Sequence, residues 1–159
     1  MLTFEQMLIR LLVALALGAI LGIERELVRK EAGARTEMLV AGGAALFAMI
    51  GLTLPYITAV SLSGAVGTTI MPDASTVNAG LGLIANIVVG IGFLGAGIII
   101  KLNNHPHGVT TAADVWATAA IGALAGIGLI QFAAAAALII ALLLFFLRKM
   151  DIPKHLRRR

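Results

Sequence analysis

The chain contains no cysteine and few charged residues. The lack of cysteine excludes a disulfide framework, a thiolate metal site and a thiol nucleophile. Only 13% of the 159 residues are charged, whereas 60% are hydrophobic, and the mean hydropathy of +1.01 lies far from the balance of a soluble domain. This composition indicates an integral membrane protein.

Sequence signatures of catalysis are also missing. The chain has no Ser-His-Asp order, no H-E-x-x-H and no Walker sequence. The stretch "VGIGFLGAG" contains G-x-G-x-x-G at Gly90, Gly92 and Gly95, but it lies inside an apolar run of membrane-crossing length with no soluble strand before it. We therefore expect a protein that is not an enzyme and binds no cofactor.

The long apolar segments predict five transmembrane helices, because a helix needs about 20 mostly apolar residues to cross the hydrocarbon layer. The last block, residues 112–147, is too long for one crossing, and "AGIGLIQ" offers a place to reverse, although a single tilted or bent helix is the alternative. The first block is expected to be a real span, since "MLTFEQ" lacks the basic residues of a signal peptide. We predict an all-α, polytopic membrane helix bundle in a membrane domain of residues 1–147, with spans at about 7–23, 38–60, 80–100, 112–127 and 130–147.

Basic residues between the spans predict the orientation. Every Lys and Arg except Arg10 lies in the first loop, at Lys101 or in residues 148–159. Because cytoplasmic segments retain positive charge, five crossings place the N-terminus outside and the C-terminus, with its basic tail of residues 148–159, in the cytoplasm. The net charge of +4 comes without a basic domain containing interleaved aromatics, so we expect contact with the lipid bilayer and no binding of nucleic acid.

Glycines recur at helical spacing within the predicted spans. In lipid, small residues let helix backbones approach closely. We therefore predict helix packing through Gly18, Gly22, Gly90, Gly92, Gly95, Gly97, Gly122 and Gly126.

Polar residues share helix faces with these glycines. The resulting stripes are Arg10, Ala14, Gly18, Gly22 and Arg25 in the first span, Asn86, Gly90, Phe93 and Gly97 in the third, and Asp114, Thr118, Gly122 and Gly126 in the fourth. Because polar groups at membrane depth face protein rather than lipid, the stripes are expected to face one another, or the same stripes of another copy in a homo-oligomer. Tight packing alone and a conduction path are the two interpretations.

The candidate functional residues are polar side chains within or beside the spans: Glu24, Arg25, Arg35, Thr36, Asn86, Thr110, Thr111 and Asp114. Asp114 lies just inside a span, where an ionisable group is a candidate ion site. With Thr111, it also fits a capping box in which both side chains satisfy open amides at a helix start.

The first loop carries acids and bases close together. Glu24, Arg25 and Arg35 are expected to form either a salt-bridged turn at the membrane interface or a substrate site. Thr36 is expected to cap the second span. The two histidines of "NNHPHG" lack a third ligand, so metal binding stays unknown.

Motifs in the first four spans resemble those of one family. The segments "LLVALALGAILGIERE", "AGARTEMLVAGG", "VGIGFLGAG" and "GVTTAADVWATAAIGALAGIG" occur in the order and spacing of the MgtC/SapB family of bacterial membrane proteins. The resemblance implies a multi-pass protein of the bacterial inner membrane. The best-known relatives support growth at low magnesium and survival inside host phagocytes, and in some of them the proposed action is restraint of the membrane ATP synthase.

The chain departs from the family pattern at several positions. Many relatives carry Arg and Gln ahead of the glycine-rich span and Ser just before it, where this chain has Gly82, Asn86 and Val89. Asp114 stands where a small or hydroxyl residue is common. The cytoplasmic ACT-like domain that longer members attach after the last span is expected to be missing.

The resemblance and the polar residues together predict a non-enzymatic protein of MgtC/SapB type in magnesium or other cation homeostasis, or in stress adaptation. One alternative is a small cation transporter or channel with a polar path along Asn86 and Asp114. The other is an accessory subunit that binds another membrane protein and regulates a complex such as the ATP synthase.

Overall fold

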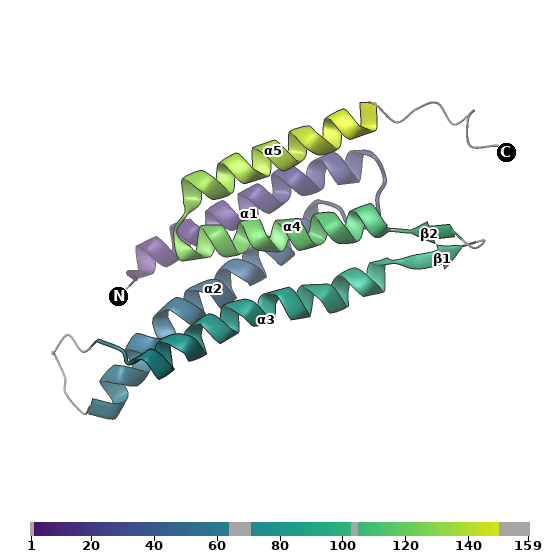
Figure 1. Ribbon diagram of the computed structural model, residues 1–159. Coiled ribbons are helices and arrows are strands. Elements are labelled where there is room, and N and C mark those ends of the chain that lie inside the picture. Colours follow the sequence, from purple (N-terminus) through teal and green to yellow (C-terminus); the bar gives the residue numbers. More distant parts are fainter. Residues whose placement is uncertain (1, 64–70, 103–104, 150–159) are drawn as a thin grey trace.

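The computed structural model describes residues 2–63, 71–102 and 105–149, which form five long helices and one short hairpin (Figure 1). The elements are α1 (Phe4–Leu27), α2 (Ala34–Ser63), α3 (Ala74–Ile98), β1 (Ile100–Leu102), β2 (His105–His107), α4 (Val109–Ile127) and α5 (Ile130–Lys149). All five helices are long and apolar enough to cross a membrane. The prediction of an all-α bundle is therefore confirmed, with five helices that are each able to span a membrane by length and composition.

The last apolar block divides into two helices at a glycine. α4 ends at Ile127, and Gly128 takes a left-handed conformation with a φ of 100°, which lets the chain reverse before α5 begins. The Gly128 N–H donates to the carbonyl of Ala125, which would otherwise be an open acceptor at the helix end. A single tilted or bent helix is excluded.

The first four helices begin before the predicted spans, and two of them, α1 and α3, follow a polar capping residue. α1 follows Thr3, whose side chain accepts from the Gln6 N–H in a capping box. α3 follows Asp73, whose carboxylate accepts from the Thr76 N–H. Hydropathy does not include these polar first turns, which is why the predicted spans were shorter than the helices.

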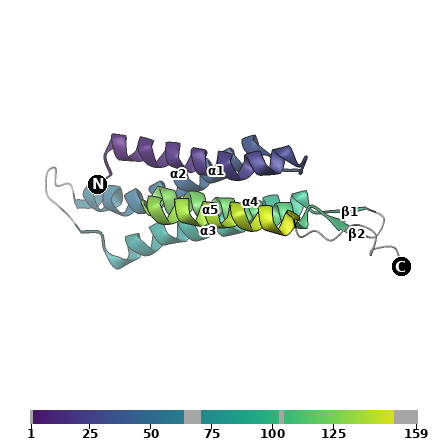
Figure 2. The same cartoon turned by 90° about the horizontal axis from the view of Figure 1, so that it is seen from above.

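α1, α2 and α4 form the centre of the bundle. α2 packs against α1, α3 and α4, and α5 packs against α1 and α4 (Figures 1 and 2). The core between these helices is made of small and branched apolar residues, among them Ala14, Leu21, Ala45 and Ile121. α3 packs against α2 and α4, and most of its surface is exposed.

The connections with basic residues lie together at one end of the bundle. Figure 1 shows the α1–α2 connection, the hairpin and the last turn of α5 at the same end, and the start of α1 and the α4–α5 turn at the other. Arg29, Lys30, Lys101 and Lys149 therefore share one end, which we call the basic end. Residues 150–159, most of the predicted basic tail, lie outside the described residues.

Candidate functional site

Two glycines of α1 bring its backbone against the start of α2. A Cβ added at Gly18 would lie 2.5 Å from the carbonyl oxygen of Glu37, and one at Gly22 would meet the Cα of Ala34. Any side chain at these positions would force the helices apart, so this G-x-x-x-G pair allows the close approach.

The glycines of α4 make the matching contact with the next turns of α2. A Cβ at Gly126 would lie 2.5 Å from the carbonyl oxygen of Ala45, and one at Gly122 would meet the backbone of Ala41. Arg10 of α1 closes this region, because its Nη1 donates to the Gly126 carbonyl at 2.8 Å. The predicted stripes of α1 and α4 therefore lie inside the bundle, one on each side of α2.

The stripe of α3 lies elsewhere. A Cβ at Gly90, Gly92 or Gly97 would meet no atom within 4 Å, and one at Gly95 would touch Ala112 at 3.6 Å. Phe93 is 86% exposed. No helix among the described residues packs against this stripe. Its contact with another copy or another protein stays a prediction.

Arg25 and Asp114 form a buried ion pair between α1 and α4. The Arg25 Nε lies 3.2 Å from Asp114 Oδ2, and the two side chains are only 4% and 1% exposed. Burying either charge alone would cost several kcal/mol, at least about 3, so each residue makes the burial of the other tolerable.

The predicted capping box of Thr111 and Asp114 is wrong. α4 begins at Val109, and its N-cap residue is Gly108, which has a left-handed φ of 81°. Gly108 packs directly against the Ile98 carbonyl at the end of α3, which sets the helix start earlier than the motif suggested. Asp114 consequently lies beyond the first turn, on the buried face.

Thr111 connects the ion pair to the first loop. Its hydroxyl accepts a hydrogen bond from Arg25 Nη2 at 2.9 Å and donates to Glu31 Oε2 at 2.6 Å. The Thr111 hydroxyl lowers the pKa of Glu31 from its ordinary value, and the nearby Lys30 and Arg25 charges add to this effect. The chain Glu31–Thr111–Arg25–Asp114 therefore ties the loop at the basic end to the last turn of α1 and the second turn of α4.

Glu37 and Thr118 complete the cluster, and the sequence analysis missed Glu37 as a site residue. Both side chains are fully buried, at 0% exposure. Glu37 shares a face of α2 with Ala41 and Ala45, at four-residue spacing, and these alanines meet the α4 glycines. That spacing from an acid to small residues is the signal that could have identified Glu37. We call Arg25, Glu37, Thr111, Asp114 and Thr118 the buried polar cluster; the exposed Glu31 attaches to it through Thr111.

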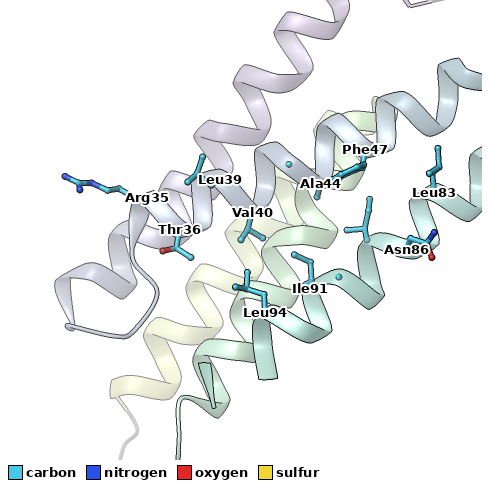
Figure 3. Close-up of a pocket in the computed structure, with 13 residues that line it drawn as sticks. Arg35, Thr36, Leu39, Val40, Ala44, Phe47, Leu83, Asn86, Ile91 and Leu94 are labelled. Atoms are coloured by element: carbon cyan, nitrogen blue, oxygen red, sulfur yellow. The ribbon is translucent and has the colours of Figure 1, made fainter. Parts of the chain in front are cut away.

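Arg35, Thr36 and Asn86 line a different region. They belong to a pocket of about 640 Å³ between α2 and α3, whose other lining residues are apolar or glycine. Figure 3 shows Arg35 and Thr36 at one end of this pocket and Asn86 at the other, with the Arg35 side chain pointing away from it. Asp114 does not line the pocket, so the structure does not place Asn86 and Asp114 on a shared path.

The cap predicted for α2 is also wrong. The helix begins at Ala34, before Thr36, and the Ala34 N–H donates to the Glu26 carboxylate at 3.1 Å. Glu26 reaches back from the end of α1 to this open amide, so an acid from the preceding helix takes the role expected of the hydroxyl.

Glu24 and Thr110 lie at the rim of the buried polar cluster. With Arg25, Val28, Lys30 and two leucines of α5, they line a cavity of about 410 Å³. Arg25 and Arg35 do not join in the salt-bridged turn predicted for them, because Arg25 turns inward to Asp114 while Arg35 is exposed.

Both histidines of the hairpin are exposed on β2. Within the described residues no three His, Asp or Glu side chains form a group that could hold a metal ion.

Comparison with known proteins gives a clear family match. Residues 11–152, which include the buried polar cluster, match the MgtC family. The chain belongs to the MgtC family. It is 38% identical over 133 residues to Protein MgtC of Salmonella typhimurium, covering 84% of this chain and 48% of the relative. Protein MgtC of Brucella abortus is 39% identical over 127 residues, covering 80% of this chain and 45% of the relative.

The chain is also similar to a protein without an assigned function. An uncharacterised protein of Synechocystis is 39% identical over 126 residues, covering 79% of this chain and 45% of the relative. The chain thus spans about half the length of the curated relatives it matches. No solved structure matches it.

Proposed function

We propose that this protein is a non-enzymatic, MgtC-type protein of the bacterial inner membrane that acts in magnesium homeostasis. The observation that carries the proposal is the family match over residues 11–152. The structure adds that polar side chains within this matched range join two of the helices. Arg25, Thr111 and Asp114 hold α1 and α4 together in the bundle.

The proposed orientation places the basic end in the cytoplasm and the N-terminus outside. Arg29, Lys30 and Lys101 lie at that end, and positively charged segments are retained on the cytoplasmic side. The same residues would meet the anionic headgroups of the inner leaflet.

A growth experiment tests the homeostasis role. A strain lacking the protein should grow poorly when magnesium is limiting, and the original gene should restore growth. Asp114→Asn should fail to restore it, whereas Glu5→Gln, at the exposed first turn of α1, should succeed at the same membrane abundance. Normal growth of the deletion strain at limiting magnesium would contradict the proposal.

A second proposal is that the protein acts as an accessory subunit or homo-oligomer through α3. The specific observation is the exposed stripe of Asn86, Gly90, Phe93 and Gly97, which combines a polar side chain at membrane depth with positions where another backbone can approach. As the family resemblance implies, a membrane complex such as the ATP synthase is one partner to test.

Two matched variants test this surface. Gly90→Leu should abolish co-purification of the partner, or of a second copy carrying a different tag, in mild detergent. Gly92→Leu makes the same change on another face of α3, also in open space, and should leave the association intact. Equal association for both variants would exclude the stripe as the contact.

A further inference from the structure

Glu37 is a carboxylate buried between helices without a hydrogen-bond partner. Both of its oxygens are inaccessible, and neither has a partner among the described residues. Gly18 and Gly22 press the α1 backbone onto the turn that carries Glu37, so water is excluded from that side. The Thr118 hydroxyl on α4 faces Glu37, and its oxygen is buried without forming a hydrogen bond among the described residues.

The charges around Glu37 do not neutralise it. The charged groups that face it are Arg25 on α1 and Asp114 on α4. The Arg25 guanidinium already pairs with Asp114 at 3.2 Å and donates to Thr111. Arg25 and Asp114 together carry no net charge, so an ionised Glu37 would be an additional buried negative charge. A carboxylate buried in this way takes up a neutralising ligand rather than remaining charged.

The space around Glu37 limits which neutralising ligand, a metal cation or a proton, can bind there. The cavity that reaches Arg25 is not lined by Glu37, Asp114 or Thr118, and the described residues offer no group of three His, Asp or Glu for a metal. A hydrated or multiply coordinated cation needs volume and oxygen ligands. A proton needs neither.

We propose that Glu37 is a proton-binding site at the α2–α4 contact, occupied at neutral pH. The proton turns Glu37 from an acceptor into an O–H donor. The oxygens of Thr118 and Asp114, which lie four residues apart on one face of α4, are the acceptors that this donor faces. The bound proton thereby removes the buried charge and supplies a hydrogen bond between the two helices. This site is independent of the proposed role in magnesium homeostasis.

Infrared spectroscopy tests the proposal on the full chain in lipid nanodiscs at neutral pH. Glutamate labelled with ¹³C at the side-chain carboxyl separates glutamate from aspartate signals, so Asp114 does not interfere. We expect a carbonyl band of a protonated carboxylic acid that shifts with the label and with exchange into D₂O. Absence of this band in the labelled original protein overturns the proposal, whether or not any variant folds.

Variants assign the band to one residue. Glu37→Gln should remove the band completely, whereas Glu5→Gln, at the exposed first turn of α1, should leave it unchanged. A band that persists in Glu37→Gln overturns the assignment. The spectra should be the same in sodium and in choline buffers, and a band that appears only after sodium is removed would show that a cation, and not a proton, occupies the site.

Discussion

The guanidinium of Arg25 and the carboxylate of Asp114 lie 3.2 Å apart where α1 meets α4, far from each other in the sequence. A buried arginine without an acid beside it would be expensive in this bundle. The contributions of Arg25 and Asp114 to stability are therefore coupled, and substituting one residue changes the cost of burying the other.

Removing the acid alone should destabilise the protein strongly. Asp114→Asn leaves the Arg25 charge buried without its partner, and we expect a loss of about 3–5 kcal/mol in the free energy of unfolding. Denaturant titration in detergent micelles, followed by circular dichroism, measures this loss. The double variant Arg25→Met with Asp114→Leu should recover most of it, because apolar residues can replace a buried pair. If the double variant is no more stable than Asp114→Asn, the unpaired Arg25 charge is not the cause of the lost stability.

The same glycine substitution should have opposite consequences in α4 and α3. Gly122→Leu places a side chain against the backbone of Ala41, and we expect a loss of at least about 1–3 kcal/mol in stability. Gly92→Leu enters open space and should change stability by less than about 0.5 kcal/mol. Thermal unfolding of both variants and the original protein in the same detergent measures these two changes in stability. Gly122→Leu thus reports on the fold, and binding of a partner must be tested on α3.

Acid should remove the contribution of Glu31 to stability. Because the Thr111 hydroxyl lowers the pKa of Glu31 in the folded state, the contribution is fully present above the unfolded value of about 4.5 and is lost as the pH falls through the lower folded value. The original protein should exceed Glu31→Gln in stability at pH 6, by less than about 1 kcal/mol for such an exposed group. The gap should close as the pH falls well below 4.5. A gap that stays constant over this range would argue against the hydrogen bond.

The lack of cysteine makes the orientation directly measurable, because each introduced cysteine is the only one in the chain. Lys30→Cys and Lys101→Cys should react with a membrane-impermeant reagent only when the cytoplasmic face is exposed. Ser75→Cys, at the opposite end of the bundle, should react in intact cells with a permeable outer membrane. Labelling of Lys30→Cys and Lys101→Cys from opposite sides would contradict both the fold and the orientation.

The number and type of the helices could be predicted because they follow from apolar length, and the reversal at Gly128 could be predicted from its glycines. The helix starts could not, because they depend on contacts with other elements. Glu26 from α1 meets the first amide of α2, and Gly108 starts α4 where the end of α3 approaches it. The local sequence at each helix start does not indicate these contacts.

The candidate site could be predicted only in part, because its residues also meet through contacts between different helices. Helical spacing placed Asp114 and Thr118 on one face of α4, which the structure gives as buried. The stripe of the first span placed Arg25 toward the other stripes, but the spacing did not indicate that it would pair with Asp114. Glu37 was missed because hydropathy treats an acid beside a loop as part of that loop, whereas the glycines of α1 enclose it.

The distance in sequence between Arg25 and its partner has a consequence for biosynthesis. α1 and α2 leave the ribosome first, and their glycine contacts allow them to pair as a hairpin as soon as both are made. Until Asp114 and Thr118 arrive on α4, that hairpin holds a guanidinium and a carboxyl group that its own residues do not satisfy. Because polar groups at membrane depth are costly beside lipid, the addition of α4 should be the step that makes the interior of this hairpin stable in the bilayer.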